Sequence, residues 1–282
     1  NHWSLIEQDT SENNSVTLSS DGLSLAYIHK AKSGYALWLK DTFSANKRVI
    51  FKSQSAPIAA PAFSPSGTKI AFFSQENNEC YIHMINLSAE PYEVSPKVNK
   101  KLNCGAWHST LKLDYLNEHE LVYSQLDSET NRYNIYTLNL NNSLAKNVSP
   151  ELIEGKGDYS FSINQETNQL AVLRATNNNK TSVLVRNLPE GESFHVLTTN
   201  TYLLSLEWLN NKKLIVFKVG RGVSKRFIKS VKSCSIAFGR PVVPVENRTN
   251  PACSFDLKDS TKSCFKLCFM RLTSSPSMTT ST

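Results

Sequence analysis

Short apolar runs recur along the first 220 residues and are separated by polar, Asn-rich loops. Five such runs stand at a regular spacing: Leu23–Ile28, Lys69–Ser74, Glu120–Ser124, Gln169–Leu173 and Lys213–Lys218. The spacings between their equivalent positions, counted from Leu25, are 45, 51, 49 and 44 residues. Each run is too short for a helix and is rich in β-branched and aromatic residues, which indicates a strand. A period in this range is typical of four-stranded propeller blades.

The residues that flank each run repeat as well. Before the first two runs come the tight turns Ser19–Gly22 and Ser64–Gly67, where Ser or Asp accepts local hydrogen bonds and Gly adopts the left-handed conformation. After a polar loop, a second alternating strand follows in four units: Ala36–Asp41, Tyr81–Asn86, Asn134–Asn139 and Ser182–Asn187. The pattern therefore predicts hairpins within every unit.

Two stretches depart from the pattern. Leu111–Glu120 falls where the third unit is longest, and we interpret it as an insertion with one or two helical turns. The fifth unit stops near Val219, where its third strand should follow, and the alternation fails beyond that point. We predict an all-β fold, a β-propeller of four units and a partial fifth, incomplete or open, with an irregular C-terminal tail.

The second unit resembles the repeat of TolB-type β-propellers, in which a W-S-P-D-G turn precedes an I-A-F strand and an I-Y-x-x-D strand follows. The matching residues are Ala62-Phe-Ser-Pro-Ser-Gly-Thr-Lys-Ile-Ala-Phe-Phe73 and Tyr81-Ile-His-Met-Ile-Asn86. The first unit is similar through Leu18–Tyr27 and Leu37–Asp41, whereas the other three units lack the turn and are similar only in their strands. The resemblance spans about residues 15 to 219 and implies a TolB-like, WD-repeat-like propeller.

Within that class, the chain resembles the extracytoplasmic half of CadC- or ToxR-like transcriptional regulators. Such proteins join a winged-helix DNA-binding domain, one transmembrane helix and a propeller. No run in these 282 residues approaches the 18 or more apolar residues of a membrane-spanning helix. We therefore expect a DNA-binding domain, membrane tether or targeting signal to lie outside the sequence, and the resemblance implies a periplasmic or extracytoplasmic location.

Charge divides the chain in two. The formal net charge is +7, but residues 221 to 282 hold 11 Lys and Arg against 3 Asp and Glu, which leaves −1 for residues 1 to 220. We therefore predict a propeller domain over 1–220 and a basic, Ser- and Cys-rich tail over 221–282 that is poorly ordered or appended. Because the repeat domain has no basic excess, we expect no direct nucleic-acid binding.

Motifs for catalysis and nucleotide binding do not emerge from the sequence. No G-x-S-x-G string occurs, and neither Gly155-Lys-Gly157 nor Gly220-Arg-Gly222 has the remaining residues of a P-loop. We interpret Glu118-His119-Glu120, a dense cluster of ionisable groups, as a solvated hairpin turn before Leu121 rather than an acid–base site. We predict no enzymatic activity and no catalytic, cofactor-binding or metal-binding residues, and hence no cofactor.

Cysteine and tryptophan leave some alternatives open. Cys80 and Cys104 lie in the repeat domain, and the tail cysteines stand at irregular spacings: Cys234, Cys253, Cys264 and Cys268. The tail set is compatible with disulfides, with a zinc site or with free thiols. We expect Trp38, Trp107 and Trp208 to pack between blades, since propellers bury large side chains there. The alternative is that they belong to a ligand-binding surface at one rim of the propeller.

Three functions remain. The first is a non-catalytic sensing propeller of a membrane-bound regulator that contacts protein partners at its rim or central channel. The second is the substrate-gating propeller of a prolyl-oligopeptidase-like serine peptidase whose catalytic domain lies elsewhere. The third is a TolB-like periplasmic scaffold of the cell envelope. All three predict no catalysis within this sequence.

Overall fold

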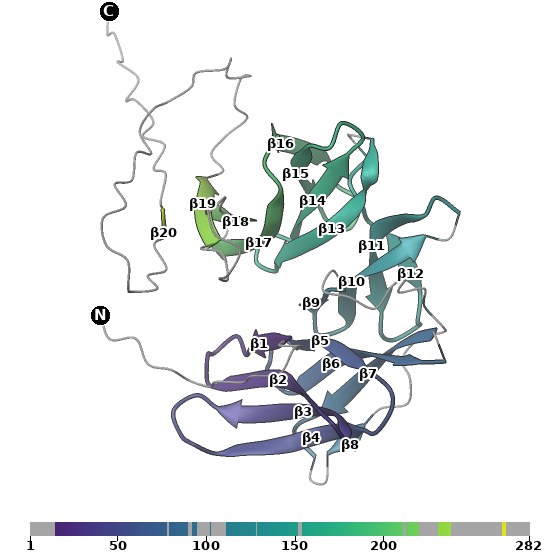
Figure 1. Ribbon diagram of the computed structural model, residues 1–282, viewed down its shortest axis with the longest axis vertical. Helices are drawn as coiled ribbons and strands as arrows, with labels where there is room; N and C mark the ends of the chain where they lie inside the picture. Colours follow the sequence, from purple (N-terminus) through teal and green to yellow (C-terminus); the bar gives the residue numbers. More distant parts are fainter. Residues whose placement is uncertain are drawn as a thin grey trace, which may run out of the picture.

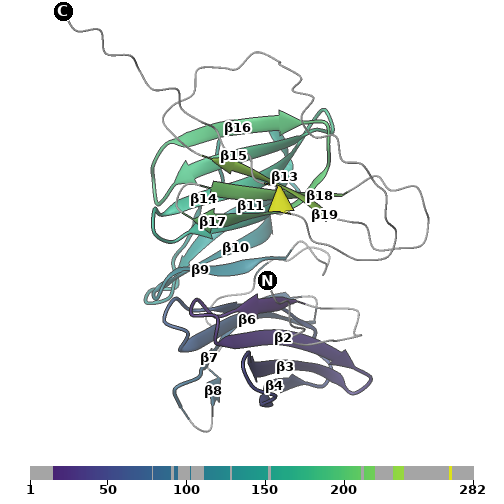
Figure 2. The same ribbon diagram turned by 90° about the vertical axis from the view of Figure 1, so that its left-hand side faces the viewer.

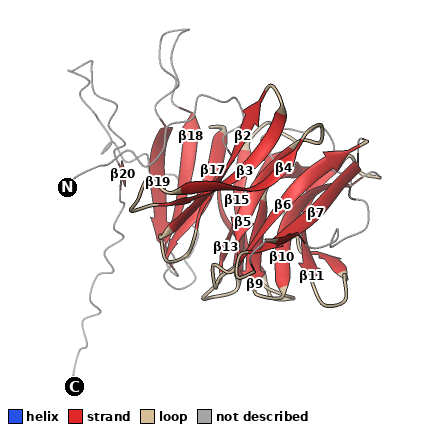
Figure 3. Ribbon diagram, turned by 90° about the horizontal axis from the view of Figure 1, so that it is seen from below, coloured by secondary structure: helices blue, strands red, loops and turns tan. Residues whose placement is uncertain are grey.

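The computed structural model describes residues 15–77, 79–89, 92–94, 102, 111–127, 129–151, 154–210, 213–219, 231–237 and 267–268. All regular elements in these residues are β-strands (Figure 3). The described residues contain no helix that is long and apolar enough to cross a membrane. The predicted all-β fold is thus confirmed.

The strands form successive antiparallel blades, as the repeat predicts (Figure 1). Blade 1 consists of β1 (Val16–Leu18), β2 (Ser24–Ala31), β3 (Gly34–Asp41) and β4 (Lys47–Ser53). Blade 2 consists of β5 (Ile58–Phe63), β6 (Lys69–Glu76), β7 (Glu79–Asn86) and β8 (Glu93–Val94). The predicted apolar runs lie in the second strand of each blade, and the predicted alternating segments lie in the third.

Blades 3 and 4 are joined in one sheet. Blade 3 consists of β9 (Leu113–Asn117), β10 (Glu120–Asp127), β11 (Arg132–Asn139) and β12 (Ala145–Asn147). Blade 4 consists of β13 (Gly155–Asn164), β14 (Gln169–Thr176), β15 (Thr181–Asn187) and β16 (Ser193–Thr199). A parallel pair between Tyr133 of β11 and Gly157 of β13 connects them. A Cβ on Gly157 would lie 2.7 Å from the Tyr133 nitrogen, so this close approach requires glycine.

Blade 5 extends further than the sequence predicts. It consists of β17 (Leu203–Asn210), β18 (Lys213–Val219), β19 (Val231–Ala237) and β20 (Leu267–Cys268). β19 pairs along the whole of β18, so the fifth unit continues beyond Val219 with the third strand that the alternation pattern did not show. Two strands of blade 5 therefore come from the basic tail, while the division into 1–220 and 221–282 stays a prediction.

The hairpin turns follow their predicted chemistry. Gly22 and Gly67 have φ angles of 73° and 71°, and each donates its N–H to the carbonyl of the serine that starts the turn. The hydroxyls of Ser19 and Ser64 accept hydrogen bonds from the first strand residues that follow. In other hairpins Asn takes the place of Gly, with positive φ at Asn77, Asn131, Asn168 and Asn179. Asn tolerates this conformation better than other L-residues, which explains hairpins without the consensus turn.

Apolar contacts between neighbouring blades form four cores, one for each pair. Between blades 1 and 2, for example, Ile28 and Leu37 pack against Phe72, and all three are fully buried. The other cores join blades 2 and 3, 3 and 4, and 4 and 5 in the same way. Side chains alternate between the two faces of a strand, so each of the three middle blades contributes to two cores.

The predicted helical insertion at Leu111–Glu120 is wrong. Leu113–Asn117 forms β9, the first strand of blade 3, and Glu120 begins β10. Apolar residues stand at every second position there, and Leu111, Leu113 and Tyr115 are all buried in the core with blade 2. This is the period of a strand rather than a helix.

The three tryptophans have different surroundings. Trp208 packs against the core between blades 4 and 5, as predicted. Trp38 is only half-buried and stacks on Tyr27 at 6.4 Å between ring centroids, on the face of blade 1 opposite to its core with blade 2. The prediction of burial between described blades is therefore wrong for Trp38. Trp107 lies outside the described residues.

The blades follow one another around an arc that is open between blades 5 and 1 (Figures 1 and 2). No described strand of blade 5 pairs with a described strand of blade 1. Open or incomplete closure was predicted and is confirmed. In Figure 1 the first strands β1, β5, β9 and β17 lie toward the middle of the arc, and the last strands β4 and β16 lie toward its outside.

A buried ion pair supplies a stability test. Both oxygens of Asp158 accept hydrogen bonds from Arg174, at 2.6 and 2.8 Å, and Asp158 is 0% exposed. Asp158→Ala would remove the carboxylate that pairs with the buried Arg174 charge, so we expect a loss of about 3–5 kcal/mol in the free energy of unfolding. Urea denaturation of the full chain measures it, with exposed Glu129→Ala as control.

The double variant Asp158→Leu/Arg174→Met removes both charges and should lose much less than Asp158→Ala. A single variant within about 0.5 kcal/mol of the unsubstituted protein would contradict the assignment of a buried, stabilising partner to Arg174.

Candidate functional site

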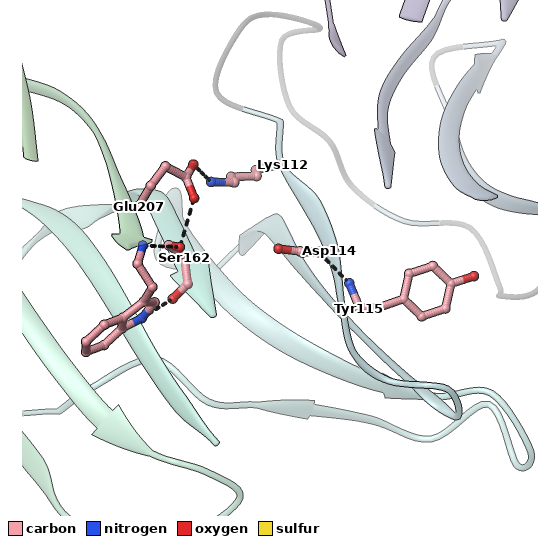
Figure 4. Close-up of polar contacts among 6 residues, drawn as sticks. Lys112, Asp114, Tyr115, Ser162 and Glu207 are labelled. Atoms are coloured by element: carbon pink, nitrogen blue, oxygen red, sulfur yellow. Dashed lines mark hydrogen bonds and ion pairs between the residues drawn. The ribbon is translucent and has the colours of Figure 1, made fainter. Parts of the chain in front are cut away.

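Polar side chains from three blades meet at the inner strands (Figure 4). Lys112 lies just before β9 and Asp114 lies in it. Ser162 lies in β13, and Glu207 lies in β17. These strands are the first strands of blades 3, 4 and 5, and β13 contacts both of the others. We call the four residues the inner-strand cluster.

An ion pair and a hydrogen bond join the cluster across the blades. Nζ of Lys112 lies 2.6 Å from Oε1 of Glu207 and 5.5 Å from the ring centroid of Phe161. The Ser162 hydroxyl donates to Oε2 of Glu207 at 2.9 Å. The Glu207 side chain is 50% exposed, so the ion pair contributes at most about 1 kcal/mol to stability. Its main effect is to orient two side chains that lie far apart in the sequence.

Trp208 anchors the cluster to the core. Its backbone N–H donates to the Ser162 hydroxyl at 3.1 Å, and its indole Nε1–H donates to the Ser162 carbonyl at 3.2 Å. The ring packs against the core between blades 4 and 5. Ser162 and Glu207 are therefore held by the packing of two blades.

Asp114 is the titratable member of the cluster. Its side chain points to the side of Ser162 and Glu207, whereas Tyr115 points away (Figure 4). Burial raises the pKa of Asp114 to about 6, and the charge of Glu207 raises it as well, while Lys112 and the Tyr115 N–H lower it. The carboxyl therefore loses its negative charge as pH falls through about 6.

The arrangement suits recognition of a polar partner. Above about pH 6 it presents one ammonium and two carboxylates, and below that pH one ammonium and one carboxylate. The Ser162 hydroxyl both donates to Glu207 and accepts from Trp208, which leaves it engaged within the protein. Ser162 is also only 2% exposed, so a substrate has no access to its hydroxyl.

Ser74 and His83 form a serine–histidine contact elsewhere, in blade 2. The Ser74 hydroxyl lies 2.7 Å from Nε2 of His83, but their exposed fractions are only 2% and 8%. The imidazole also stacks on Phe72, with centroids 5.3 Å apart. A substrate has no access to a pair buried in this way, so the contact is part of the core.

The acid-rich segment Glu118-His119-Glu120 forms the turn between β9 and β10, as predicted. Oε1 of Glu118 accepts the Ser66 N–H at 2.6 Å, which ties the turn to blade 2. Oε2 of Glu120 accepts from the Asn117 amide at 2.9 Å. These contacts stabilise the turn and do not assemble an acid–base pair.

Gly155 and Gly157 serve packing. A Cβ on Gly155 would lie 2.4 Å from the Ala175 carbonyl oxygen, so Gly155 and Gly157 both permit close backbone contacts. Gly220-Arg-Gly222 lies outside the described residues. In the part of the chain that the structure describes, no three His, Cys, Asp or Glu side chains come together as metal ligands.

Cysteine placement is described only in part. Cys80 is buried and disulfide-bonded. The backbones of Cys234 and Cys268 are paired between β19 and β20, while Cys253 and Cys264 lie outside the described residues. The alternatives for the tail cysteines therefore stay open.

Sequence reasoning missed the inner-strand cluster. Lys112 and Asp114 alternate with buried Leu111, Leu113 and Tyr115, and a polar residue at alternate positions of a strand ordinarily marks its solvent face. The sequence feature that indicates the cluster is the occurrence of polar residues in the first strands of three successive units.

Solved structures share this fold at low sequence identity. TolB from Acinetobacter baumannii matches with a TM-score of 0.59 and 17% identity, over 73% of this chain and 49% of that chain. A TolB-like protein from Agrobacterium tumefaciens matches with a TM-score of 0.51 and 12% identity, over 68% of each chain. One of two prolyl endopeptidases matches with a TM-score of 0.52 and 16% identity, over 73% of this chain and 32% of that chain.

These likenesses confirm the β-propeller fold and show the fold alone. This chain spans about half the length of the Acinetobacter TolB chain. No protein-family model matches the sequence. The finer resemblance to CadC- or ToxR-like regulators is not shown by these structures and stays a prediction.

Asp114 makes stability depend on pH. Its pKa in the folded protein, about 6, exceeds the ordinary value of 3.8, so folding favours proton binding between these values. Asp114→Asn keeps the acceptor for the Tyr115 N–H and removes the charge. We expect the variant to be more stable than the unsubstituted protein by on the order of 2 kcal/mol near pH 7.5, with the difference shrinking toward pH 4 and vanishing below about pH 3.

Urea denaturation of the full chain at several pH values measures this difference. Exposed Glu166→Gln is the control and should follow the unsubstituted protein throughout. A constant difference between Asp114→Asn and the unsubstituted protein from pH 4 to 7.5 would contradict the assigned pKa.

Proposed function

We propose that this propeller is a non-catalytic protein-binding module that engages its partner at the inner-strand cluster. The carrying observation is the convergence of Lys112, Asp114, Ser162 and Glu207 from three blades, with Trp208 holding Ser162 and Glu207 in place. Charged and hydrogen-bonding groups in fixed positions give specificity to a protein interface.

An extracytoplasmic location forms part of the proposal. TolB proteins, whose fold this chain shares, work in the periplasm, and disulfides persist in oxidising compartments. The disulfide at Cys80 supports such a location. A periplasmic envelope scaffold fits these observations most simply. The finer alternative, the sensing domain of a membrane-bound CadC- or ToxR-like regulator, requires a membrane helix and a DNA-binding domain outside this sequence.

A second candidate is the substrate-gating propeller of a prolyl-oligopeptidase-like peptidase. The likeness to a prolyl endopeptidase structure, at a TM-score of 0.52, favours it. In that case the inner strands would face substrate on its way to a catalytic domain outside this sequence. Both candidates place the functional surface at the same strands, and neither requires nucleic acid.

Charge reversal at the cluster tests the proposal. The full chain with Glu207→Lys, which sets two ammonium groups against each other, should lose at least about tenfold in affinity for a partner captured from a periplasmic extract. Lys112→Glu should have the same effect, and Lys112→Glu/Glu207→Lys should recover part of the binding. The matched control is Lys146→Glu/Glu190→Lys, at an exposed ion pair of β12 and the loop before β16.

Quantitative mass spectrometry of the captured proteins gives the result. Partners that bind both inner-strand variants as well as the unsubstituted chain would contradict the proposed surface. Hydrolysis of proline-containing peptides by the purified chain would contradict the non-catalytic assignment.

A further inference from the structure

A polar cleft lies between blades 3 and 4, apart from the inner-strand cluster. Its volume is about 360 Å³, which is within the range of small-molecule sites. Six of its polar lining residues carry the argument: Arg132, Asn134, Ser149, Glu151, Glu154 and Arg174.

The cleft results from the way in which the two blades join. β12 is only three residues long and pairs with β11 at Tyr136–Leu138, so the first part of β11 has no β12 beside it. β13 approaches that part of β11 at a single pair, Tyr133 with Gly157. The Ser149 hydroxyl accepts the Ile135 N–H at 2.8 Å, which satisfies the edge of β11 without filling the space.

A rigid polar surface lines one side. Arg174 is held by two hydrogen bonds to the fully buried Asp158 and is itself only 8% exposed. Gly155 and Gly157 present backbone without side chains beside it. A buried ion pair adds little net stability over apolar packing. The presence of the Arg174–Asp158 pair is therefore better explained by the fixed polar wall that it gives the cleft.

Opposite charges face the cleft without meeting. Arg132 projects from β11, and Glu151 and Glu154 project from the segment that leads to β13. All three are exposed, and no ion pair within 4.0 Å joins Arg132 to either carboxylate. The cleft therefore keeps one cation and two anions apart on its borders.

We propose that this cleft binds a small zwitterionic solute, a free amino acid or a short peptide. The solute carboxylate pairs with the Arg132 guanidinium, which matches carboxylate geometry with two parallel hydrogen bonds. Its ammonium group pairs with Glu151 and Glu154. The Asn134 amide lies along the cleft, where it is able to bond a peptide group. A purely anionic ligand is disfavoured by the two carboxylates, and an apolar one by the polar walls.

Isothermal titration calorimetry with the full chain tests the proposal, with L-alanyl-L-alanine as the probe. We expect a dissociation constant of about 1 mM. N-acetyl-alanyl-alanine lacks the ammonium group and alanyl-alanine amide lacks the carboxylate, so each loses one exposed charge pair and should bind about three- to fivefold more weakly. Free L-alanine, which keeps both charges, distinguishes an amino-acid site from a peptide site.

Two variants with substitutions at exposed residues locate the site. Arg132→Gln should weaken binding of the dipeptide and leave the already weak binding of its amide unchanged. Glu151→Gln/Glu154→Gln should also weaken binding of the dipeptide, and it should leave the already weak binding of the N-acetyl compound unchanged. Exposed Glu166→Gln is the control and should bind as the unsubstituted chain does. All variants should keep the unfolding midpoint of the unsubstituted chain, because the residues are at the surface.

The proposal is overturned by any of three results. They are no heat of binding for either zwitterion up to about 10 mM, equal binding of the blocked and free dipeptides, or unchanged binding in both variants. None of them bears on the inner-strand cluster, whose partner assay is independent.

Discussion

The packing of one blade against the next is the interaction on which this structure depends. An isolated four-stranded sheet with apolar residues on both faces cannot bury either of them alone. Ala71 and Phe72 are adjacent in β6, yet they lie in different cores, one shared with blade 3 and the other with blade 1. Neighbouring blades therefore stabilise one another, and the fold grows by repetition around the arc.

The same constraint creates the inner-strand cluster. When blades stack, their first strands converge, and β13 contacts both β9 and β17 although consecutive first strands are about 45 residues apart in sequence. Ser162 is fixed by Trp208, whose ring belongs to the core between blades 4 and 5. Site geometry and blade packing are therefore coupled: a change that shifts blade 5 against blade 4 also moves Glu207 relative to Lys112.

Local chemistry made most strands predictable. Alternation, turn glycines and a period near 47 residues are properties of neighbouring residues, and they located the second strand of every blade and the third strand of the first four. The error at Leu111–Glu120 arose because the third unit is the longest, which indicated an insertion at this point. The strand appears once Leu113 and Tyr115 are seen on one face, against blade 2.

Long-range chemistry was not predictable in this way. Lys112 and Glu207 form an ion pair only because two intervening blade interfaces bring β9 and β17 together. No local sequence pattern indicates that these two side chains lie close to each other. Gly155-Lys-Gly157 shows the converse. Its spacing resembles part of a phosphate-binding loop, but its cause is the close approach of Tyr133 and Ala175 backbone.

A glycine motif in a repeat fold is thus ambiguous until the neighbouring strands are known, because glycine permits close approach of a ligand and of another strand equally well. In this propeller Gly155 and Gly157 permit close approach of neighbouring strands. The polar cleft beside Arg174 lies next to them. The close approaches of Gly157 to β11 and of Gly155 to β14 therefore explain both the motif and the position of the cleft.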